Sequence, residues 1–339
     1  MASNNGLVLY LGTNDGVYLA EPNGQGFNAR LLGFQGKGVM RAPVVVDKDD
    51  PSLLYAGTNR AGMFRSRDRG ETWEEINDGL VHKDVWTITQ HPKTGTLIIG
   101  TSPAGVFMST NQGDTWEEAS HLQTLPTSKG WHGPQPPHVS RVKDFALADE
   151  ENGLIYGVIE EGWAVRSLDG GATWEQIDNG VDHDGHAVVA MPGNPRTVVA
   201  ATGKGMFRSE DAGEHWVEAN SGLEGRVYVA GPLVTHPGQP GVLASTVTAV
   251  SPGQWHRPEG ADTAFARSQD GGKTWRMSNG GLPNPSSVMR ALAVDPEDAD
   301  TYYSGMLDGT VWLSNDGGDS FRKVLEDLPG VNSVTAARV

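Results

Sequence analysis

The chain has 339 residues, a formal net charge of −16 and no cysteine. The lack of thiols excludes disulfide bonds, thiolate metal sites and a cysteine nucleophile. The acidic charge argues against nucleic acid and anionic membrane as partners, because both require a basic surface. No apolar run approaches the roughly 18 residues of a membrane span and no signal peptide is recognisable, so we expect a cytoplasmic protein unless a leader has been removed.

The length exceeds the roughly 100–200 residues of a usual single core, which leaves two domains or one repetitive fold. A recurring corner favours the repetitive fold. It runs Ser-x-Asp-x-Gly-x-Thr-Trp with few departures, as in the stretch SLDGGATW of residues 167–174. Its six copies begin at Ser66, Ser109, Ser167, Ser209, Ser268 and Ser314, and residues 20–27 hold a worn copy. The Asp suits a tight turn, the Gly supplies a positive φ, and the aromatic is expected to anchor the following strand against the next repeat.

In chain order, three apolar stretches come first, LVLYLGT, GVYLAE and FNARLL. The later units each hold a strand A, a strand B such as TLIIGT, a strand C such as GVFMS, the corner, and a strand D such as TWEEI. Strands A are expected to begin near Met40, Val85, Ser140, His186, Tyr228, Val288 and Val334. Four strands in roughly 45 residues predict a propeller blade.

We therefore predict an all-β fold, a single seven-bladed β-propeller domain of four-stranded blades over residues 1–339. The final stretch, VNSVTAARV, is a strand A without successors, and the N-terminus supplies strands B to D without an A. The N- and C-terminal strands are thus expected to close one shared blade, and loss of the last nine residues should be severely destabilising.

The corners resemble the Asp-box, or BNR, repeat of sialidases, Vps10-type receptors, xyloglucanases and photosystem II assembly factors. The resemblance covers nearly the whole chain and implies the propeller fold, whereas the activities of these families differ. It also implies that the corners are structural and lie on the face remote from any ligand site. The opposite face, made by the D-to-A and B-to-C loops, is where a site is expected.

The individual families carry over unequally. Met40-Arg41-Ala42-Pro43 resembles the aromatic-Arg-Ile-Pro motif of sialidases, which implies that Arg41 binds a carboxylate, but no Tyr–Glu pair is assignable. A xyloglucanase of this class clamps a glycan between two propellers, and a Vps10 receptor adds a cysteine-rich segment that this chain lacks. A photosystem assembly factor would be an interaction module with an arginine patch.

Two long insertions fall on the expected site face, residues 121–141 from strand D to A and residues 246–265 from strand B to C. Long loops on a rigid scaffold usually bind a ligand or cover a site, and the alternative is a passive rim. Each insertion holds a Trp-His pair, Trp131-His132 and Trp255-His256, which we expect to contact the substrate.

Histidines concentrate in the same loops. His82 and His138 occupy equivalent places before strands A, and the next blade offers His183, Asp184 and His186. These five are the candidate catalytic residues. Three interpretations stay open: a divalent metal of the zinc, iron or manganese kind held by His82, His138 and His186, metal-free acid–base catalysis, or separate solvated histidines.

Arginines complete the expected site. They lie at the starts of strands A or in B-to-C loops and could clamp an anion: Arg41, Arg60, Arg141, Arg226 and Arg290. The favoured hypothesis is an enzyme that hydrolyses, or eliminates a group from, a small polar or anionic, sugar-derived molecule. The alternative is a non-catalytic propeller that binds a ligand, glycan or protein. Apart from the metal, no cofactor is expected.

Overall fold

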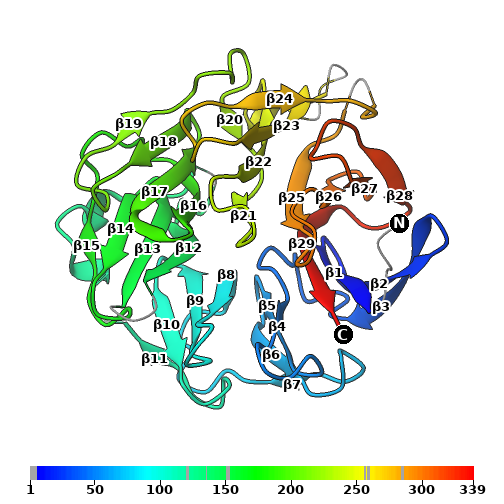
Figure 1. Ribbon diagram of the computed structural model, residues 1–339. Helices are drawn as coiled ribbons and strands as arrows, with labels where there is room; N and C mark the ends of the chain where they lie inside the picture. The colour runs from blue at the N-terminus through cyan, green and yellow to red at the C-terminus, as the bar shows by residue number, and fades with distance from the viewer. Residues whose placement is uncertain are drawn as a thin grey trace.

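The computed structural model describes residues 6–119, 122–134, 136–149, 153–255, 257, 260–283 and 286–339. Its strands form seven antiparallel sheets that stand in a ring around a central axis, as Figure 1 shows. The prediction of an all-β, seven-bladed propeller is confirmed. Among the described residues, no helix is long and apolar enough to cross a membrane.

The blades follow one another around the ring in sequence order, with the first strand of each nearest the axis (Figure 1). Blade 1 is β29 (Val331–Arg338), β1 (Leu7–Thr13), β2 (Gly16–Asn23) and β3 (Gly26–Gly33). Blade 2 is β4 (Val45–Val46), β5 (Leu54–Thr58), β6 (Gly62–Ser66) and β7 (Glu74–Glu75). Blade 3 is β8 (Asp84–Gln90), β9 (Leu97–Ser102), β10 (Val106–Ser109) and β11 (Glu117–Glu118). Blade 4 is β12 (Arg141–Asp149), β13 (Leu154–Glu160), β14 (Trp163–Ser167) and β15 (Glu175–Gln176).

The last three blades depart from this pattern only in blade 6. Blade 5 is β16 (Gly185–Met191), β17 (Asn194–Thr202), β18 (Gly205–Ser209) and β19 (Val217–Glu218). Blade 6 has its inner strand broken into β20 (Tyr228–Val229) and β21 (Val234–Thr235), followed by β22 (Leu243–Thr248), β23 (Thr263–Ser268) and β24 (Arg276–Ser278). Blade 7 is β25 (Met289–Val294), β26 (Tyr302–Met306), β27 (Val311–Ser314) and β28 (Arg322–Leu325).

The two ends of the chain close the ring in blade 1. Strand β29 pairs antiparallel with β1 from Leu7↔Arg338 to Thr13↔Val331. Leu9, Leu11 and Val331 are fully buried in the cluster that joins blade 1 to blade 7. The predicted sharing of one blade by the terminal strands is confirmed.

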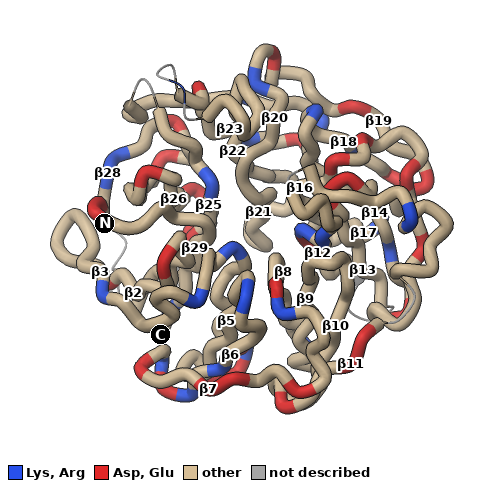
Figure 2. The backbone as a smooth tube through the Cα atoms, turned by 180° about the vertical axis from the view of Figure 1, so that it is seen from behind, with Lys and Arg blue, Asp and Glu red and all other residues tan. Residues whose placement is uncertain are grey.

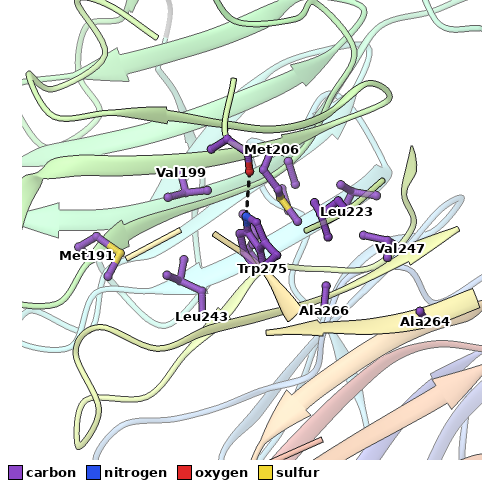
Figure 3. Close-up of a cluster of buried hydrophobic side chains, with 14 residues drawn as sticks. Met191, Val199, Met206, Leu223, Leu243, Val247, Ala264, Ala266 and Trp275 are labelled. Carbon is purple, nitrogen blue, oxygen red and sulfur yellow. Dashed lines mark hydrogen bonds between the residues drawn. The ribbon is translucent and has the colours of Figure 1, made fainter. Parts of the chain in front are cut away.

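The hydrophobic core is divided among the interfaces between neighbouring blades. Figure 3 shows the cluster between blades 5 and 6, where Trp275 packs against Val199 and Met206 and its indole donates to the carbonyl oxygen of Ala219 at 2.9 Å. Trp116 and Trp216 donate in the same way across their own interfaces. The corner aromatic thus anchors against the preceding blade, and the expectation that it packs against the next one is wrong.

The six corners share one hydrogen-bond pattern, and the corner of blade 4 is typical. The Ser167 hydroxyl donates to Asp169 at 2.8 Å and accepts from the Gly171 amide at 2.8 Å. The Asp169 carboxylate also accepts from the amide and the hydroxyl of Thr173, at 2.8 and 2.6 Å. In blade 2, hydrogen bonds from Thr72 lower the pKa of the equivalent Asp68 to about 2. Each corner is therefore a structural staple built around one ionised carboxylate or its amide counterpart.

Arginines on the third strand of several blades tie that blade to the next corner. Arg65 donates to the Gln112 carbonyl at 2.8 Å, Arg166 to Ala212 at 2.7 Å and Arg208 to Gly271 at 2.8 Å. Arg166 also pairs with Glu175 of its own blade and with Glu214 of the next. These charges stabilise the outer ring rather than a ligand site.

Two sequence expectations about local structure are wrong. Residues 20–27 form no corner, because β2 and β3 pair continuously up to Asn23↔Gly26. Strand A of blade 2 does not begin at Met40, since its ladder covers only Val45 and Val46. Pro43 lies just ahead of that ladder and has no N–H to donate to one.

Both long insertions leave the same end of the ring. The first joins β11 to the start of β12, and the second joins the end of β22 to the start of β23, which pairs with it through Thr248↔Thr263. They carry the three helical turns of the described residues, Leu122–Thr124, Ser128–Gly130 and Pro252–Gln254.

The corner carboxylate is predicted to stabilise the fold without touching the axis. Asp270→Ala removes the bonds from Ser268 and Thr274, so we expect a loss of about 1–3 kcal/mol in the free energy of unfolding. Asp270→Asn should lose less than about 1 kcal/mol, because Asn111 already serves in the corner of blade 3. Chemical denaturation of both variants measures the difference.

The same pair of variants tests the pH dependence. Burial would raise the pKa of Asp270, but hydrogen bonds from Thr274 and Ser268 outweigh it and lower that pKa from 3.8 to about 2. Its stabilising contribution is therefore present above pH 3.8 and is lost as the pH falls through about 2. Asp270→Asn should lack this part of the acid-induced loss, and identical pH profiles for the wild type and Asp270→Asn would contradict the role given to the carboxylate.

Deletion of residues 331–339 is predicted to abolish cooperative unfolding of the ring. It removes β29, exposes the buried face of β1 and leaves an unpaired strand edge at the axis. A thermal melt followed by circular dichroism measures the effect. A synthetic peptide of residues 329–339 should restore the transition, and the same peptide with Val331 and Val334 replaced by Asp should not. A deletion variant that melts like the full chain would show that the closure is dispensable.

Candidate functional site

On most inner strands, the ladder to the second strand skips one residue near the start of the inner strand. In blade 3, Val85 pairs with Thr101 and Thr87 with Gly100, so Trp86 has no partner in the ladder. The residues skipped in this way, in blades 3, 4, 5, 7 and 1, are Trp86, Lys143, His186, Arg290 and Asn332. All five line one cavity of about 310 Å³ on the axis. Such bulges redirect a side chain, and here they aim one residue per strand at the axis.

Blades 2 and 6 fill the same ring position without a bulge. Arg41 lies in the segment before β4, in a stretch Val-Met-Arg-Ala that recurs around Arg290. Its backbone is fixed by the Met40 amide, which donates to Thr13 at 2.9 Å, and by the Ser333 hydroxyl, which donates to Ala42 at 3.1 Å. In blade 6 the corresponding residue is Ala230. We call these seven residues the axial ring, in blade order Asn332, Arg41, Trp86, Lys143, His186, Ala230 and Arg290.

Cations gather around one indole of this ring. The guanidinium carbons of Arg41 and Arg141 lie 4.5 and 4.1 Å from the Trp86 ring centre, and the Lys143 ammonium lies 4.8 Å from it. Arg290 lines the same cavity as Arg41 and Lys143 and is the fourth cation of the group. We call Arg41, Arg141, Lys143 and Arg290 the cation cage. Basic residues flank the axis near β8, β12 and β25 in Figure 2.

The cage cations are unequally paired with carboxylates. Glu160 forms ion pairs with Arg141 and with Lys143, the latter at 3.2 Å. Arg290 donates to the Ala230 carbonyl at 2.8 Å. Among the described residues, no carboxylate lies within ion-pair distance of Arg41 or Arg290. These two guanidinium groups therefore face the cavity without an ion pair, although the charge of the nearby Asp84 opposes the fall in the pKa of Arg41.

Burial disfavours the charged forms of the cage cations. It lowers the pKa of Arg41 and of Arg290, and it lowers the pKa of Lys143 to about 8 despite the opposing effect of Glu160. For Glu160 itself, burial would raise the pKa, but Lys143 and Arg141 outweigh burial and leave it lowered. An anion entering the cavity would relieve the unfavourable burial of these cations.

A second group of polar side chains adjoins the cage. Single ligand atoms of Glu160, Asp184 and His186 lie within 4.8 Å of one another. His186 places Nδ1 2.8 Å from the Val229 carbonyl oxygen and Nε2 3.2 Å from Asp184 Oδ1. Burial would raise the pKa of Asp184, but its contact with His186 outweighs burial and lowers it.

This group is the set that could hold a divalent metal among the residues that the structure describes. Two carboxylates and an imidazole suit zinc, manganese or iron, and the contact of His186 Nδ1 with a carbonyl is the usual orienting partner of a metal-bound imidazole. Both oxygens of Glu160 already face cage cations, so a metal would share that carboxylate with them.

His82 and His138 do not belong to this group. The His82 ring lies edge-on to Phe107, 5.9 Å between centres, on the outer side of blade 3. His138 is exposed, and its Nδ1 lies 2.9 Å from the carbonyl oxygen of Gly133 within its own loop. The structure therefore does not bring His82, His138 and His186 together, because the first two precede their inner strands and lie outside the axial ring.

The other candidate histidines that the structure describes, His183 and His132, lie near Glu161. His183 Nε2 is 2.8 Å from a carboxylate oxygen of Glu161, and His132 Nδ1 is 4.0 Å from the same oxygen. Both imidazoles are substantially exposed, at 43% for His183 and 60% for His132. His121 and His256 lie outside the described residues.

The predicted arginines divide into two sets. Arg41, Arg141 and Arg290 belong to the cage. Arg60 is exposed, and Arg226 is bound to Asp262 at 2.6 Å within the rim of blade 6. The structure thus brings three of the five arginines to the axis.

The predicted tryptophans also differ in place. Trp131 is 7% exposed and packs in the cluster between blades 3 and 4 with Val142 and Ile159, so it supports the loop instead of walling the cavity. Trp255 packs on Tyr228 with 5.9 Å between ring centres, and Tyr228 packs on His186 at 5.0 Å. The second insertion therefore reaches the axis through Tyr228.

Sequence analysis missed four residues of the cavity, Trp86, Lys143, Asp144 and Asn332, and noted the adjoining Glu160 only as an acidic group in a B-to-C loop. Asp144 accepts from the amides of Phe145 and Val188 at 2.9 and 3.1 Å, yet burial raises its pKa to about 7. Their position in the repeat could have identified most of them, because each except Glu160 lies at the bulge of an inner strand or next to it.

No family model and no curated protein matches the chain. Among solved structures, an ancestral GH74 enzyme is similar at 17% identity with a TM-score of 0.66, over 92% of this chain and 40% of its own. A candidate 6-phosphogluconolactonase from Bacteroides uniformis is similar at 14% identity with a TM-score of 0.63, over 98% and 99% of the two chains. YCF48 bound to D1 peptide is similar at 19% identity with a TM-score of 0.53, over 84% and 82%.

These likenesses show the seven-bladed fold. The chain spans about 40% of the GH74 enzyme, so it corresponds to part of that protein. Proteins with different printed descriptions share this architecture, so the fold alone does not define an activity.

Replacement of Arg290 is predicted to leave the fold as stable as before or more stable. Because burial lowers its pKa, the charged form is less favourable in the folded than in the unfolded chain. We expect Arg290→Met to lie within about 1 kcal/mol of the wild type or above it. Arg166→Met, a matched change of an arginine with several partners, should lose about 2–4 kcal/mol. Urea denaturation distinguishes them, and a large loss for Arg290→Met would mean that the cage is structural.

Proposed function

We propose that the protein is an enzyme that acts on a small anionic, sugar-derived molecule bound in the axial cavity. The observation that carries the proposal is the cation cage: Arg41, Arg141 and Lys143 lie over the ring of Trp86, Arg290 lines the same cavity as that indole, and Glu160 pairs with two of the four cations. Buried unpaired cations destabilise a fold, and their retention at a concave site favours an anion-binding role.

The cavity is suited to one small ligand. Its volume of about 310 Å³ is at the lower end of ligand pockets. Arg41, Lys143 and Arg290 line it from blades 2, 4 and 7, and small or apolar residues, Ala230, Gly231 and Pro232, line the side of blade 6. The indole of Trp86 offers an aromatic face, and guanidinium groups supply directional donors to an oxyanion.

The chemistry we propose is hydrolysis or elimination. In an elimination, a C–H bond next to the anionic group breaks, its electrons form a C=C bond, and the leaving oxygen departs with a proton. The cage would stabilise charge that develops on the substrate, and His186, oriented by the Val229 carbonyl and by Asp184, would transfer the proton. In a hydrolysis, the same pair would activate the water that adds across the broken C–O bond.

The metal-dependent version of this proposal uses Glu160, Asp184 and His186 as ligands. A divalent ion there would supply Lewis-acid chemistry beside the cage. Metal analysis of the purified protein, with and without chelator, separates this version from metal-free proton transfer.

A non-catalytic binding propeller is the second candidate. The observation that favours it is that both oxygens of Glu160 are occupied by cage cations, which leaves that carboxylate poorly placed to act as a base. The same cage could hold the anionic end of a peptide or glycan, and YCF48 with its D1 peptide shows that a propeller of this kind can bind a peptide.

The double variant Arg41→Met/Arg290→Met is predicted to weaken anion binding at least about 100-fold, since each charged hydrogen bond contributes about 1.5–3 kcal/mol. Calorimetry with a panel of sugar acids and sugar phosphates measures it. Arg276→Met is the control, because Arg276 is exposed on β24 and pairs with Asp319. If no anion binds, or if the double variant binds like the wild type, the proposal is wrong.

Turnover distinguishes the two candidates. His186→Gln and Asp184→Asn should abolish product formation while retaining binding, and elimination would give a conjugated product that absorbs in the ultraviolet. Binding without any turnover across the panel would favour the non-catalytic propeller.

A further inference from the structure

The three cations of the axial ring are spread around the axis. Arg41 comes from blade 2, Lys143 from blade 4 and Arg290 from blade 7. Going around the ring, they are separated by two, three and two blades, which is the most even spacing that seven positions allow for three groups. Donors therefore approach the axis from three directions.

This arrangement discriminates between oxyanions. A carboxylate presents two oxygens in one plane on one side of its carbon, and a pair of donors on the same side satisfies it. A phosphoryl group presents three terminal oxygens around the P–O ester axis and carries about −1.5 to −2 charges at pH 7. Three cations around an axis match its number of oxygens, and its greater charge gains more from three cations than the single charge of a carboxylate does.

We propose that the axial cavity binds the phosphoryl group of a small phosphate ester, with one terminal oxygen facing each of Arg41, Lys143 and Arg290. The inference rests on the proposed function and names the anionic group of its ligand. Arg141 is not among the residues that line the cavity. It pairs with Glu160 and stacks on Trp86 at 4.1 Å.

The three donors are held in place before a ligand arrives. Arg41 is stacked on Trp86 at 4.5 Å, Lys143 is held by Glu160 at 3.2 Å, and Arg290 is held by the Ala230 carbonyl at 2.8 Å. Each still has N–H groups to donate, since a guanidinium carries five and an ammonium three. Such preorganisation lowers the entropy lost on binding.

The rest of the ligand has room on one side. Between Arg290 and His186 the ring residue is Ala230, followed by Gly231, where the inner strand of blade 6 is interrupted. An ester group extending there from the phosphoryl would lie beside His186. In ring order His186 thus lies between Lys143 and Arg290, on the side toward which the ester group would extend.

A matched pair of probes tests the inference. Glucose 6-phosphate and glucuronate share a sugar ring and differ in carrying a phosphoryl or a carboxylate group at the same end. Calorimetry at pH 7.5 should give at least tenfold tighter binding of glucose 6-phosphate, and glucose should not bind. The affinity for glucose 6-phosphate should fall as the pH drops below about 6, where the phosphate loses its second charge.

Variants locate the effect. Arg41→Met, Lys143→Met and Arg290→Met should each weaken binding of glucose 6-phosphate at least tenfold, whereas Arg276→Met should not change it. Thermal unfolding of each variant checks that the ring stays folded.

The outcomes are distinguishable. Glucuronate binding as tightly as glucose 6-phosphate, and losing affinity in the same variants, would overturn the phosphoryl inference and leave the anion-binding function standing. Absence of binding by both probes and by the wider panel would overturn both. Binding of glucose 6-phosphate that is insensitive to all three variants would place the phosphoryl group elsewhere and overturn the inference alone.

Discussion

The bulge near the start of the inner strands is the constraint on which the site depends. The second strand of the blade lies opposite the bulge, and in blades 3 and 7 a glycine of that strand lets the next blade pack closely against it. A Cβ on Gly100 would lie 2.8 Å from Val142, and one on Gly305 would lie 2.3 Å from Val331. The ladder must therefore stay intact on both sides of the bulge. The skipped residue has no ladder partner to satisfy, so its side chain can vary without disturbing the blade. The fold thus separates packing, which every blade needs, from the axial ring, which differs from blade to blade.

The strain at the axis is tolerated because stability comes from elsewhere. Buried clusters join each pair of neighbouring blades, the corners satisfy their own backbone, and Arg65 and Arg166 tie third strands to the following corners. Ring closure through β29 completes blade 1 and connects these interfaces into a circle. With stability distributed in this way, Arg41 and Arg290 can remain buried without carboxylate partners, as expected of a site that sacrifices stability for function.

The sequence predicted the architecture well because the corner is a local device. Its Asp, Gly and hydroxyl residues act within eight positions, so every copy is visible in the chain. The site was harder, because residues from different blades meet only through the ring. Arg41 and Arg290 were found because they lie at the starts of strands A, whereas His82 and His138 were placed by counting back from the Gly-Thr of strand B, which leads past the inner strand into the loop before it. Trp86 was not predicted, because a bulge shifts the register by one residue and the amino-acid composition does not indicate where a bulge occurs.

Charge distribution adds a size limit to the proposed selectivity. The chain as a whole carries a formal charge of −16, so its outer surface repels anions, whereas the cage is positive inside a cavity of about 310 Å³. A long polyanion would meet the repulsive surface without reaching the cage, and a small anion can enter and gain the full attraction at low dielectric. Glu160 sharpens this contrast, since it fixes Arg141 and Lys143 in place and leaves Arg41 and Arg290 without carboxylates. An acidic exterior around a small cationic cavity therefore selects compact anions over nucleic acids, by the same charges that fix the cage.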